Sequence, residues 1–218
     1  MKNILIIFFV FLFSFNVISC SRKDSGSSST STDSDGTNNS CFSTSISSRQ
    51  LARSSNDYAY GVATDLSGNV YVAGGTNGGL DGNTNAGNTD LFVVKYNSSG
   101  TKQWTNQLGS SSRDSANGVA PDSSGNVYVT GMTNGGLDGC KSAGVEDLFV
   151  VKYNASGTKQ WTNQLGSSSR DSANDIATDS SGNIYVTGTT YWELDGNTSA
   201  GKADLFVVKY NSSGTKQW

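Results

Sequence analysis

The sequence predicts an all-β protein in which three four-stranded units follow one another along the chain. Residues 61–117 and 118–174 align without gaps at a period of 57 and differ at ten positions, and residues 175–218 continue the same register. Each copy holds four segments rich in Val, Tyr, Phe, Thr and Trp, which strands prefer, separated by turn residues. The chain is therefore predicted to be a repeat array.

In the first copy, the strand-like segments are residues 60–64, 69–74, 91–96 and 102–108. The short connections 65–69 and 97–101 share one design, in which an Asx side chain opens the turn and a Gly takes positive φ. Both are predicted to be hairpin turns. The connection 76–90 is longer and rich in Gly and Asn, and residues 109–117 link one unit to the next.

The third segment of each unit carries large apolar residues on both faces, as in Leu91-Phe92-Val93-Val94. A small sheet stacked between copies of itself buries both faces, and this arrangement is a β-propeller. We therefore expect a β-propeller-like array of three four-stranded blades, incomplete or completed by oligomerisation.

Two repeated motifs resemble a known family. The motif D-x-S-G-N-[VI]-Y-V-[AT]-G begins at Asp65, Asp122 and Asp179, and D-L-F-V-V-K-Y-N-x-S-G-T-K-Q-W ends at Trp104, Trp161 and Trp218. Both closely resemble the SBBP-type β-propeller repeat, and the resemblance covers about 170 of the 218 residues. It implies a β-propeller fold in a bacterial secreted or surface protein, and it brings no catalytic residues.

The repeat domain is predicted at residues 47–218, with repeats at about 61–117, 118–174 and 175–218. Propellers close with ~4–8 blades, so three units should not close alone. Three arrangements stay open: a fragment of a larger propeller protein, an open arc, and a homodimer that forms a six-bladed ring. Residues 47–52 correspond to the last strand of a unit. They are predicted to complete a blade whose own last strand stops at Trp218, in the same chain or in a neighbouring one.

The N-terminal residues predict where in the cell the protein is located. Residues 1–19 have a short positive start and an apolar run that is shorter than the ~20 residues of a membrane-spanning helix, as in a signal peptide. Val17-Ile18-Ser19-Cys20 resembles a bacterial lipobox, which implies lipidation of Cys20; an ordinary signal peptide with an incidental Cys is the alternative. Residues 20–46 are rich in Ser, Thr and Asn and predict a disordered tether. We expect a lipid-anchored protein of the bacterial envelope, in the outer membrane or at the cell surface.

Composition excludes several functions. The chain has no His, which removes Ser-His-Asp and Cys-His catalysis and every His-containing metal site. Its net charge of −3 does not indicate the positively charged surface that binds nucleic acid. No carboxylate pair is singled out by spacing, so we expect no enzymatic activity and no cofactor.

One rim of the array carries the long loops and most of the variable residues. Its carboxylates include Asp81, Asp90, Asp138, Asp147, Asp195 and Asp204. Clustered carboxylates are suitable Ca²⁺ ligands, but no known calcium spacing is present. The alternative is structural: Asp90 and its equivalents cap the strand entry, and Asp81 closes an Asx turn.

Tyr191, Trp192 and Glu193 replace Asn-Gly-Gly of the other two copies. Exposed aromatic residues beside a carboxylate are typical of sugar and peptide sites; the alternative is that they cap a terminal blade or an interface. Cys41 and Cys140 could pair in an oxidising envelope. We therefore expect a lipid-anchored, non-catalytic scaffold for a protein or glycan ligand, with a carbohydrate-active enzyme using rim carboxylates as the alternative.

Overall fold

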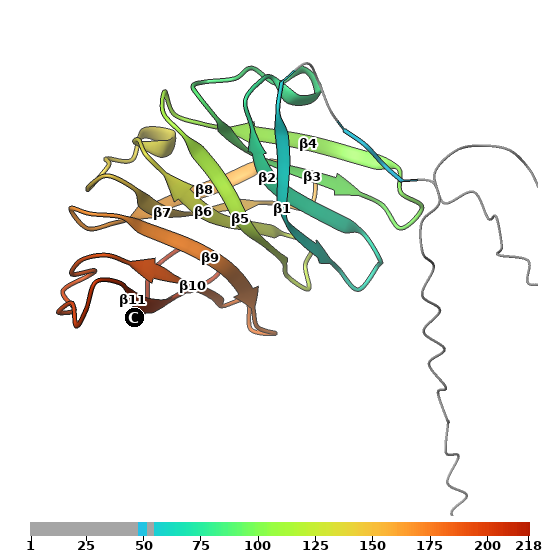
Figure 1. Cartoon of the computed structure of the whole chain (residues 1–218). Coiled ribbons are helices and arrows are strands. Elements are labelled where there is room, and N and C mark those ends of the chain that lie inside the picture. Colours follow the sequence, from blue (N-terminus) through green and yellow to red (C-terminus); the bar gives the residue numbers. More distant parts are fainter. Residues whose placement is uncertain (1–47, 52–54) are drawn as a thin grey trace, which may run out of the picture. The chain divides into compact units, whose positions relative to one another are not determined.

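A computed structural model describes residues 48–51 and 55–218, which belong to one compact unit, Ser48–Trp218 (Figure 1). The predicted signal peptide, Cys20, the tether and Cys41 lie outside the described residues. Within these residues there are eleven strands and no α-helix, which confirms the all-β fold class.

The strands form three antiparallel sheets, each of which is one blade. The first has the order β1-β2-β3-β4, from Asp57–Thr64, Val70–Thr76, Asp90–Tyr96 and Lys102–Leu108. The second repeats this order with β5 (Asp114–Pro121), β6 (Val127–Thr133), β7 (Asp147–Tyr153) and β8 (Lys159–Leu165). The third contains β9 (Asp171–Thr178), β10 (Ile184–Thr190) and β11 (Asp204–Tyr210).

The predicted hairpin turns are present, with Gly68 and Gly100 at φ values of 75° and 74°. β1 begins earlier than predicted, at Asp57, because the pairing with β2 continues past a register shift between Ala59 and Gly61. A bulge of this kind adds a residue to one strand without ending the ladder. The sequence analysis also missed two short 3₁₀ turns in the β2–β3 and β6–β7 loops, η1 (Leu80–Gly82) and η2 (Leu137–Gly139).

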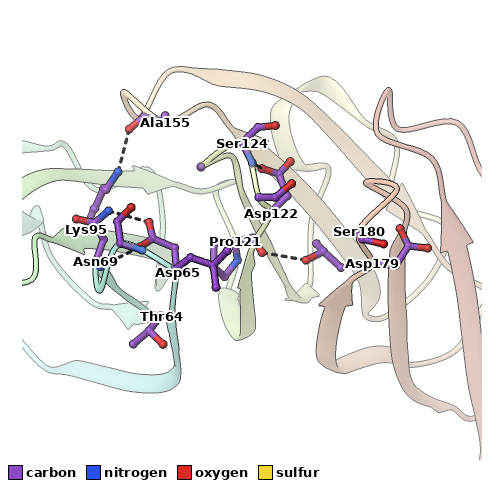
Figure 2. Close-up of a pocket in the computed structure, with 15 residues that line it drawn as sticks. Thr64, Asp65, Asn69, Lys95, Pro121, Asp122, Ser124, Ala155, Asp179 and Ser180 are labelled. Atoms are coloured by element: carbon purple, nitrogen blue, oxygen red, sulfur yellow. Dashed lines mark hydrogen bonds between the residues drawn. The ribbon is translucent and has the colours of Figure 1, made fainter. Parts of the chain in front are cut away.

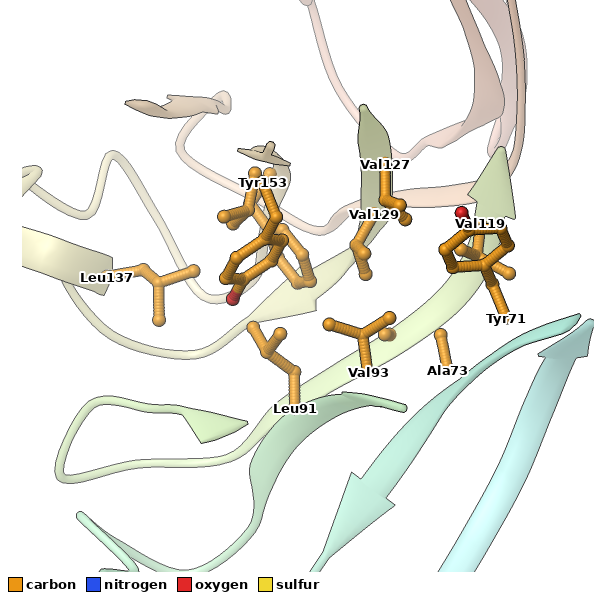
Figure 3. Packing of buried hydrophobic residues seen from close by; sticks show 12 residues of the cluster. Tyr71, Ala73, Leu91, Val93, Val119, Val127, Val129, Leu137 and Tyr153 are labelled. Atoms are coloured by element: carbon orange, nitrogen blue, oxygen red, sulfur yellow. The ribbon is translucent and has the colours of Figure 1, made fainter. Parts of the chain in front are cut away.

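Neighbouring blades pack face to face. Tyr71, Leu91 and Val93 of the first blade share one buried cluster with residues of the second, including Val127 and Val129 (Figure 3). Phe149 and Val151 belong to the same cluster. The second and third blades repeat this packing, with Leu148 and Val150 in one cluster with Phe206 and Val208. The apolar residues on both faces of each third strand are explained by this stacking.

The fourth strand of the third blade is short. Residues 216–218 occupy its position, and they pair with the end of β11 through a bridge between Tyr210 and Lys216 and a hydrogen bond from the Lys209 N–H to the Trp218 carbonyl (2.8 Å). The outer edge of β11 between Asp204 and Val208 is therefore unpaired within the described residues.

Residues 49–51 lie against the first blade in the position of a fourth strand from a preceding blade. Arg49 Nε donates to the Gly100 carbonyl (3.0 Å), as the Asn106 amide donates to Gly157 (2.8 Å) and the Asn163 amide to Gly214 (2.7 Å) in the next two blades. Leu51 packs against Leu80, Phe92 and Val94.

Candidate functional site

The antiparallel meander places the connections of each blade on two rims. The β1–β2 and β3–β4 turns lie on one rim, and the β2–β3 loops and the links between blades lie on the other. The second rim carries every predicted ligand residue. We call the first the turn rim and the second the loop rim.

Three of the predicted loop-rim carboxylates are engaged in ion pairs. Asp81, Asp138 and Asp195 have left-handed backbone conformations (φ 55°, 55° and 57°), and pair with Lys102, Lys159 and Lys216. Burial raises the pKa of Asp138, but hydrogen bonds from Lys159 and Thr162 and the charge of Lys159 outweigh it, so the pKa is lowered. These aspartates therefore tie the β2–β3 loop and its equivalents to the fourth strand.

The other three carboxylates hold the loop that precedes their strand. Asp90, Asp147 and Asp204 each accept a hydrogen bond from the backbone N–H four residues earlier, at 2.8, 2.8 and 2.9 Å. In the first two blades the same oxygen also accepts from a fourth-strand amide, Gln107 (2.8 Å) or Gln164 (2.7 Å). This is the strand-entry role that the sequence offered as the alternative to calcium binding.

Across residues 48–51 and 55–218, no group of three or more Cys, Asp or Glu side chains is placed to hold a metal ion. The six aspartates that were candidates for calcium are not brought together into one site. Cys140, the candidate partner of Cys41, is half-buried and has no disulfide partner among the described residues, and the pKa of its thiol is raised by burial.

The predicted aromatic loop lies between β10 and β11. Tyr191 and Trp192 are 49% and 56% exposed, and Glu193 is exposed beside them. The loop is fixed by the Thr190 hydroxyl, which donates to the Trp192 carbonyl (2.8 Å) and accepts from its N–H (3.3 Å). Trp192 borders a hollow of about 300 Å³ together with Leu205, Val207 and Trp218, whereas Tyr191 and Glu193 do not line it. The three residues thus do not form one pocket.

A hollow of about 550 Å³ lies on the turn rim, opposite the predicted residues (Figure 2). The β1–β2 turns of all three blades line it, and they contribute Asp65, Asp122 and Asp179, while Lys95 and Ala155 lie at one side. The Lys95 ammonium of the first blade donates to the Ala155 carbonyl of the second blade (3.4 Å).

Each of these aspartates is fixed by its own turn. Asp65 Oδ1 accepts from the N–H groups of Ser67 (2.9 Å) and Asn69 (3.0 Å), and Oδ2 accepts from the Asn69 amide (2.7 Å) and the Tyr71 hydroxyl (2.9 Å). The same four bonds recur at Asp122 and Asp179. The carboxylate oxygens that line the hollow are thus already engaged in hydrogen bonds within their own blades.

Electrostatics keep two of these carboxylates ionised. Burial raises the pKa of Asp65, but the bonds from Asn69, Tyr71 and Ser67 outweigh it and the pKa is lowered. The pKa of Asp179 is lowered mainly by its bond from Asn183. The hollow therefore presents fixed negative charge and hydrogen-bonding groups, which suit binding better than proton transfer.

The D-x-S-G-N motif by itself predicts only a hairpin turn and not this hollow. The signal that could have found it is the recurrence of the motif in all three copies. Identical turns at the same position of stacked blades must lie side by side on one rim.

The stacked four-stranded blades and the repeated turn chemistry define a β-propeller repeat protein. The β-propeller repeat named SBBP matches residues 48–81, 103–138 and 160–191. These three matches confirm the resemblance to that family that the repeated motifs predicted.

Two curated proteins are similar to the chain. One is the regulatory protein FlaEY of Caulobacter vibrioides, which is 29% identical over 171 residues, covering 71% of this chain and 18% of FlaEY. The other is an uncharacterized WD repeat-containing protein, L264, of Acanthamoeba polyphaga mimivirus, which is 29% identical over 168 residues, covering 64% of this chain and 12% of L264. The chain spans less than a fifth of the length of these relatives.

The part of the chain that the structure describes contains no helix long and apolar enough to cross a membrane.

Proposed function

We propose that the chain is a lipid-anchored protein of the bacterial envelope, in the outer membrane or at the cell surface, whose β-propeller repeat domain is a non-catalytic scaffold that binds a protein or glycan. One observation carries the scaffold role: the repeated carboxylates on both rims are engaged in bonds within their own blades. Similarity to a regulatory protein and a WD repeat-containing protein also favours interaction over catalysis.

The pKa directions favour the same conclusion. Hydrolysis of a glycoside needs one carboxyl group that stays protonated beside one that stays ionised. Asp65, Asp138, Asp179 and Asp204 all have lowered pKa values, so each is suited only to the ionised role. The residues of the turn-rim hollow therefore make a binding surface of fixed charge.

The lipid anchor rests on the lipobox-like Val17-Ile18-Ser19-Cys20. Replacing Cys20 with Ala in the full chain should remove the thiol that accepts the lipid and release the protein from the detergent phase into the aqueous phase. Cys41→Ala is the matched control, because it changes the other N-terminal Cys and should leave partitioning unaltered. Equal partitioning of the wild type and Cys20→Ala would contradict the anchor.

Exposed Trp192 favours a glycan as one ligand class, because an indole face stacks on the apolar face of a sugar. A glycan array probed with the full chain should give signals that Trp192→Gly removes, since Gly stands at this position in the other two copies. The control is Tyr191→Asn, the corresponding change at the neighbouring position. Turnover of a glycoside that Glu193→Gln abolishes would instead establish the carbohydrate-active enzyme.

A further inference from the structure

Four aspartates of the loop rim are buried without a cationic partner. They begin the third strand of one blade or the first strand of the next, and they are Asp90, Asp114, Asp147 and Asp171. Each is at most 1% exposed. Within the described residues none of them forms an ion pair, in contrast to the aspartates of the β2–β3 loop and its equivalents. Buried charges in proteins are normally paired or bound to a metal ion.

Asp147 and Asp171 lie together where the second blade meets the third, and we call them the acidic pair. The Asp171 N–H donates to the carbonyl of Glu146, the residue before Asp147 (2.7 Å). A Cβ at Gly166 would lie 2.0 Å from Asp147 Oδ1, and the N–H of the next residue, Ser167, donates to Asp171 Oδ2. Both carboxylates thus contact two consecutive residues of one link.

The link between the first and second blades repeats this arrangement for Asp90 and Asp114. The Asp114 N–H donates to the Thr89 carbonyl (2.7 Å). A Cβ at Gly109 would lie 2.1 Å from Asp90 Oδ1, and the Ser110 N–H donates to Asp114 Oδ2. Both links have the sequence Gly-Ser-Ser-Ser-Arg-Asp, in which only Gly leaves room for the carboxylate.

Three oxygens of these buried carboxylates lack a hydrogen-bond donor. Asp90 Oδ1, Asp147 Oδ1 and Asp171 Oδ1 have no partner in the part of the chain that the structure describes. About nine in ten buried polar groups have a partner, and a carboxylate oxygen without one is costly to bury. Two carboxylates placed together also repel each other, and burial strengthens the repulsion. The acidic pair therefore requires a neutralising partner.

The two links differ in how the first strand of the following blade is satisfied. The Thr133 hydroxyl donates to Asp114 Oδ1 in the second blade. The equivalent hydroxyl of Thr190 donates to the Trp192 carbonyl instead (2.8 Å), and Asp171 Oδ1 receives no hydrogen bond. The link between the second and third blades therefore combines two fully buried carboxylates with two unpartnered oxygens.

We propose that the acidic pair binds a divalent cation, for which Ca²⁺ is best suited. Two carboxylates balance a charge of +2, and Ca²⁺ prefers oxygen ligands in a flexible geometry. Asp147 Oδ2 accepts hydrogen bonds from the Ala143 N–H and the Gln164 amide, and Asp171 Oδ2 accepts from Ser167, so each Oδ1 is left for the ion. Because the pair supplies only two side chains, backbone carbonyls and water complete the coordination, as Ca²⁺ allows.

The bound ion would join two blades, because Asp147 belongs to β7 of the second blade and Asp171 to β9 of the third. A ligand that binds only the folded protein stabilises it, so Ca²⁺ should stabilise the array. Asp90 and Asp114 have one unpartnered oxygen instead of two, and we expect weaker binding there.

Calorimetric titration of the full chain in detergent with Ca²⁺, after removal of metal by a chelator, tests the site. A pair of carboxylates is a small ligand charge, so we expect a dissociation constant of about 10⁻⁴–10⁻³ M, the range of extracellular Ca²⁺ modules. Asp147→Asn and Asp171→Asn should each raise this constant at least about tenfold, because each removes one of the two charges and keeps the side-chain shape.

Glu193→Gln is the matched control, because it removes one carboxylate charge from an exposed position of the same rim and should leave the affinity for Ca²⁺ unchanged. Circular dichroism checks that each variant is folded, and the two Asn variants are independent of each other. Urea unfolding in Ca²⁺ and in EDTA gives a second measurement. Ca²⁺ should raise the unfolding midpoint of the wild type and of Glu193→Gln, and should raise it less in the Asn variants.

A folded wild-type chain that binds no Ca²⁺ up to ~10 mM, about ten times the upper end of the expected range, would overturn the proposal. Water or a proton would then satisfy the acidic pair. Equal affinity of the wild type and both Asn variants would also overturn it. None of these results depends on whether the scaffold binds another protein or a glycan.

Discussion

The residue that defines the turn rim is the aspartate that opens each β1–β2 turn. Asp65 accepts four hydrogen bonds, and one of them comes from Tyr71, which is fully buried. Asn97 opens the β3–β4 turn in the same way, with its neutral Oδ1 accepting from the N–H groups of Ser99 (3.1 Å) and Thr101 (2.8 Å). The two turns share one backbone design and differ in charge.

This difference predicts a pH dependence of stability. Because the pKa of Asp65 is lowered in the folded protein, its contribution is fully present above the unfolded pKa of about 4 and is lost as the pH falls through the lower folded value. Asp65→Asn should therefore lower the free energy of unfolding at pH 7 and make it fall less steeply as the pH is lowered. Asn97→Asp should add a further fall in the free energy of unfolding as the pH is lowered. Urea unfolding between pH 2 and pH 7, followed by Trp fluorescence, measures both effects; parallel curves for wild type and Asp65→Asn would contradict this account.

At the scale of strands, the repeat provides a comparison within one molecule. Leu91, Leu148 and Leu205 occupy the same position of β3, β7 and β11, yet Leu148 is fully buried between two blades and Leu205 is 84% exposed. The same side chain is thus a core residue or a surface residue according to whether another blade packs against that face. Local sequence alone does not distinguish the two cases.

We therefore expect opposite outcomes from one substitution. Leu148→Ala should lower the free energy of unfolding by ~2–5 kcal/mol, because it leaves a cavity between blades. Leu205→Ala should change it by no more than about 0.5 kcal/mol when unfolding is measured at a concentration low enough for single chains. Similar losses for the two variants would show that the face of the third blade is already covered within one chain.

The sequence was sufficient to predict the strands and their turns, because both depend on local signals. The alternation of apolar residues and the Asx and Gly positions placed each strand to within three residues. The functions of the loop-rim aspartates could not be predicted, because their partners come from other strands. Gln107, for example, reaches Asp90 only through the pairing of β3 with β4.

At the scale of the whole molecule, the blades are held together by packing between their faces. Phe149 and Val151 of β7 belong to the cluster shared with the first blade, and Leu148 and Val150 of the same strand belong to the cluster shared with the third. The second blade therefore links the other two through opposite faces of one strand.

The two faces of β7 should therefore respond separately to substitution. Phe149→Ala removes packing against the first blade and should lower hydrogen-exchange protection most in β3, whereas Leu148→Ala removes packing against the third blade and should lower it most in β11. Equal losses in β3 and β11 for both variants would show that the two interfaces between blades open as one unit.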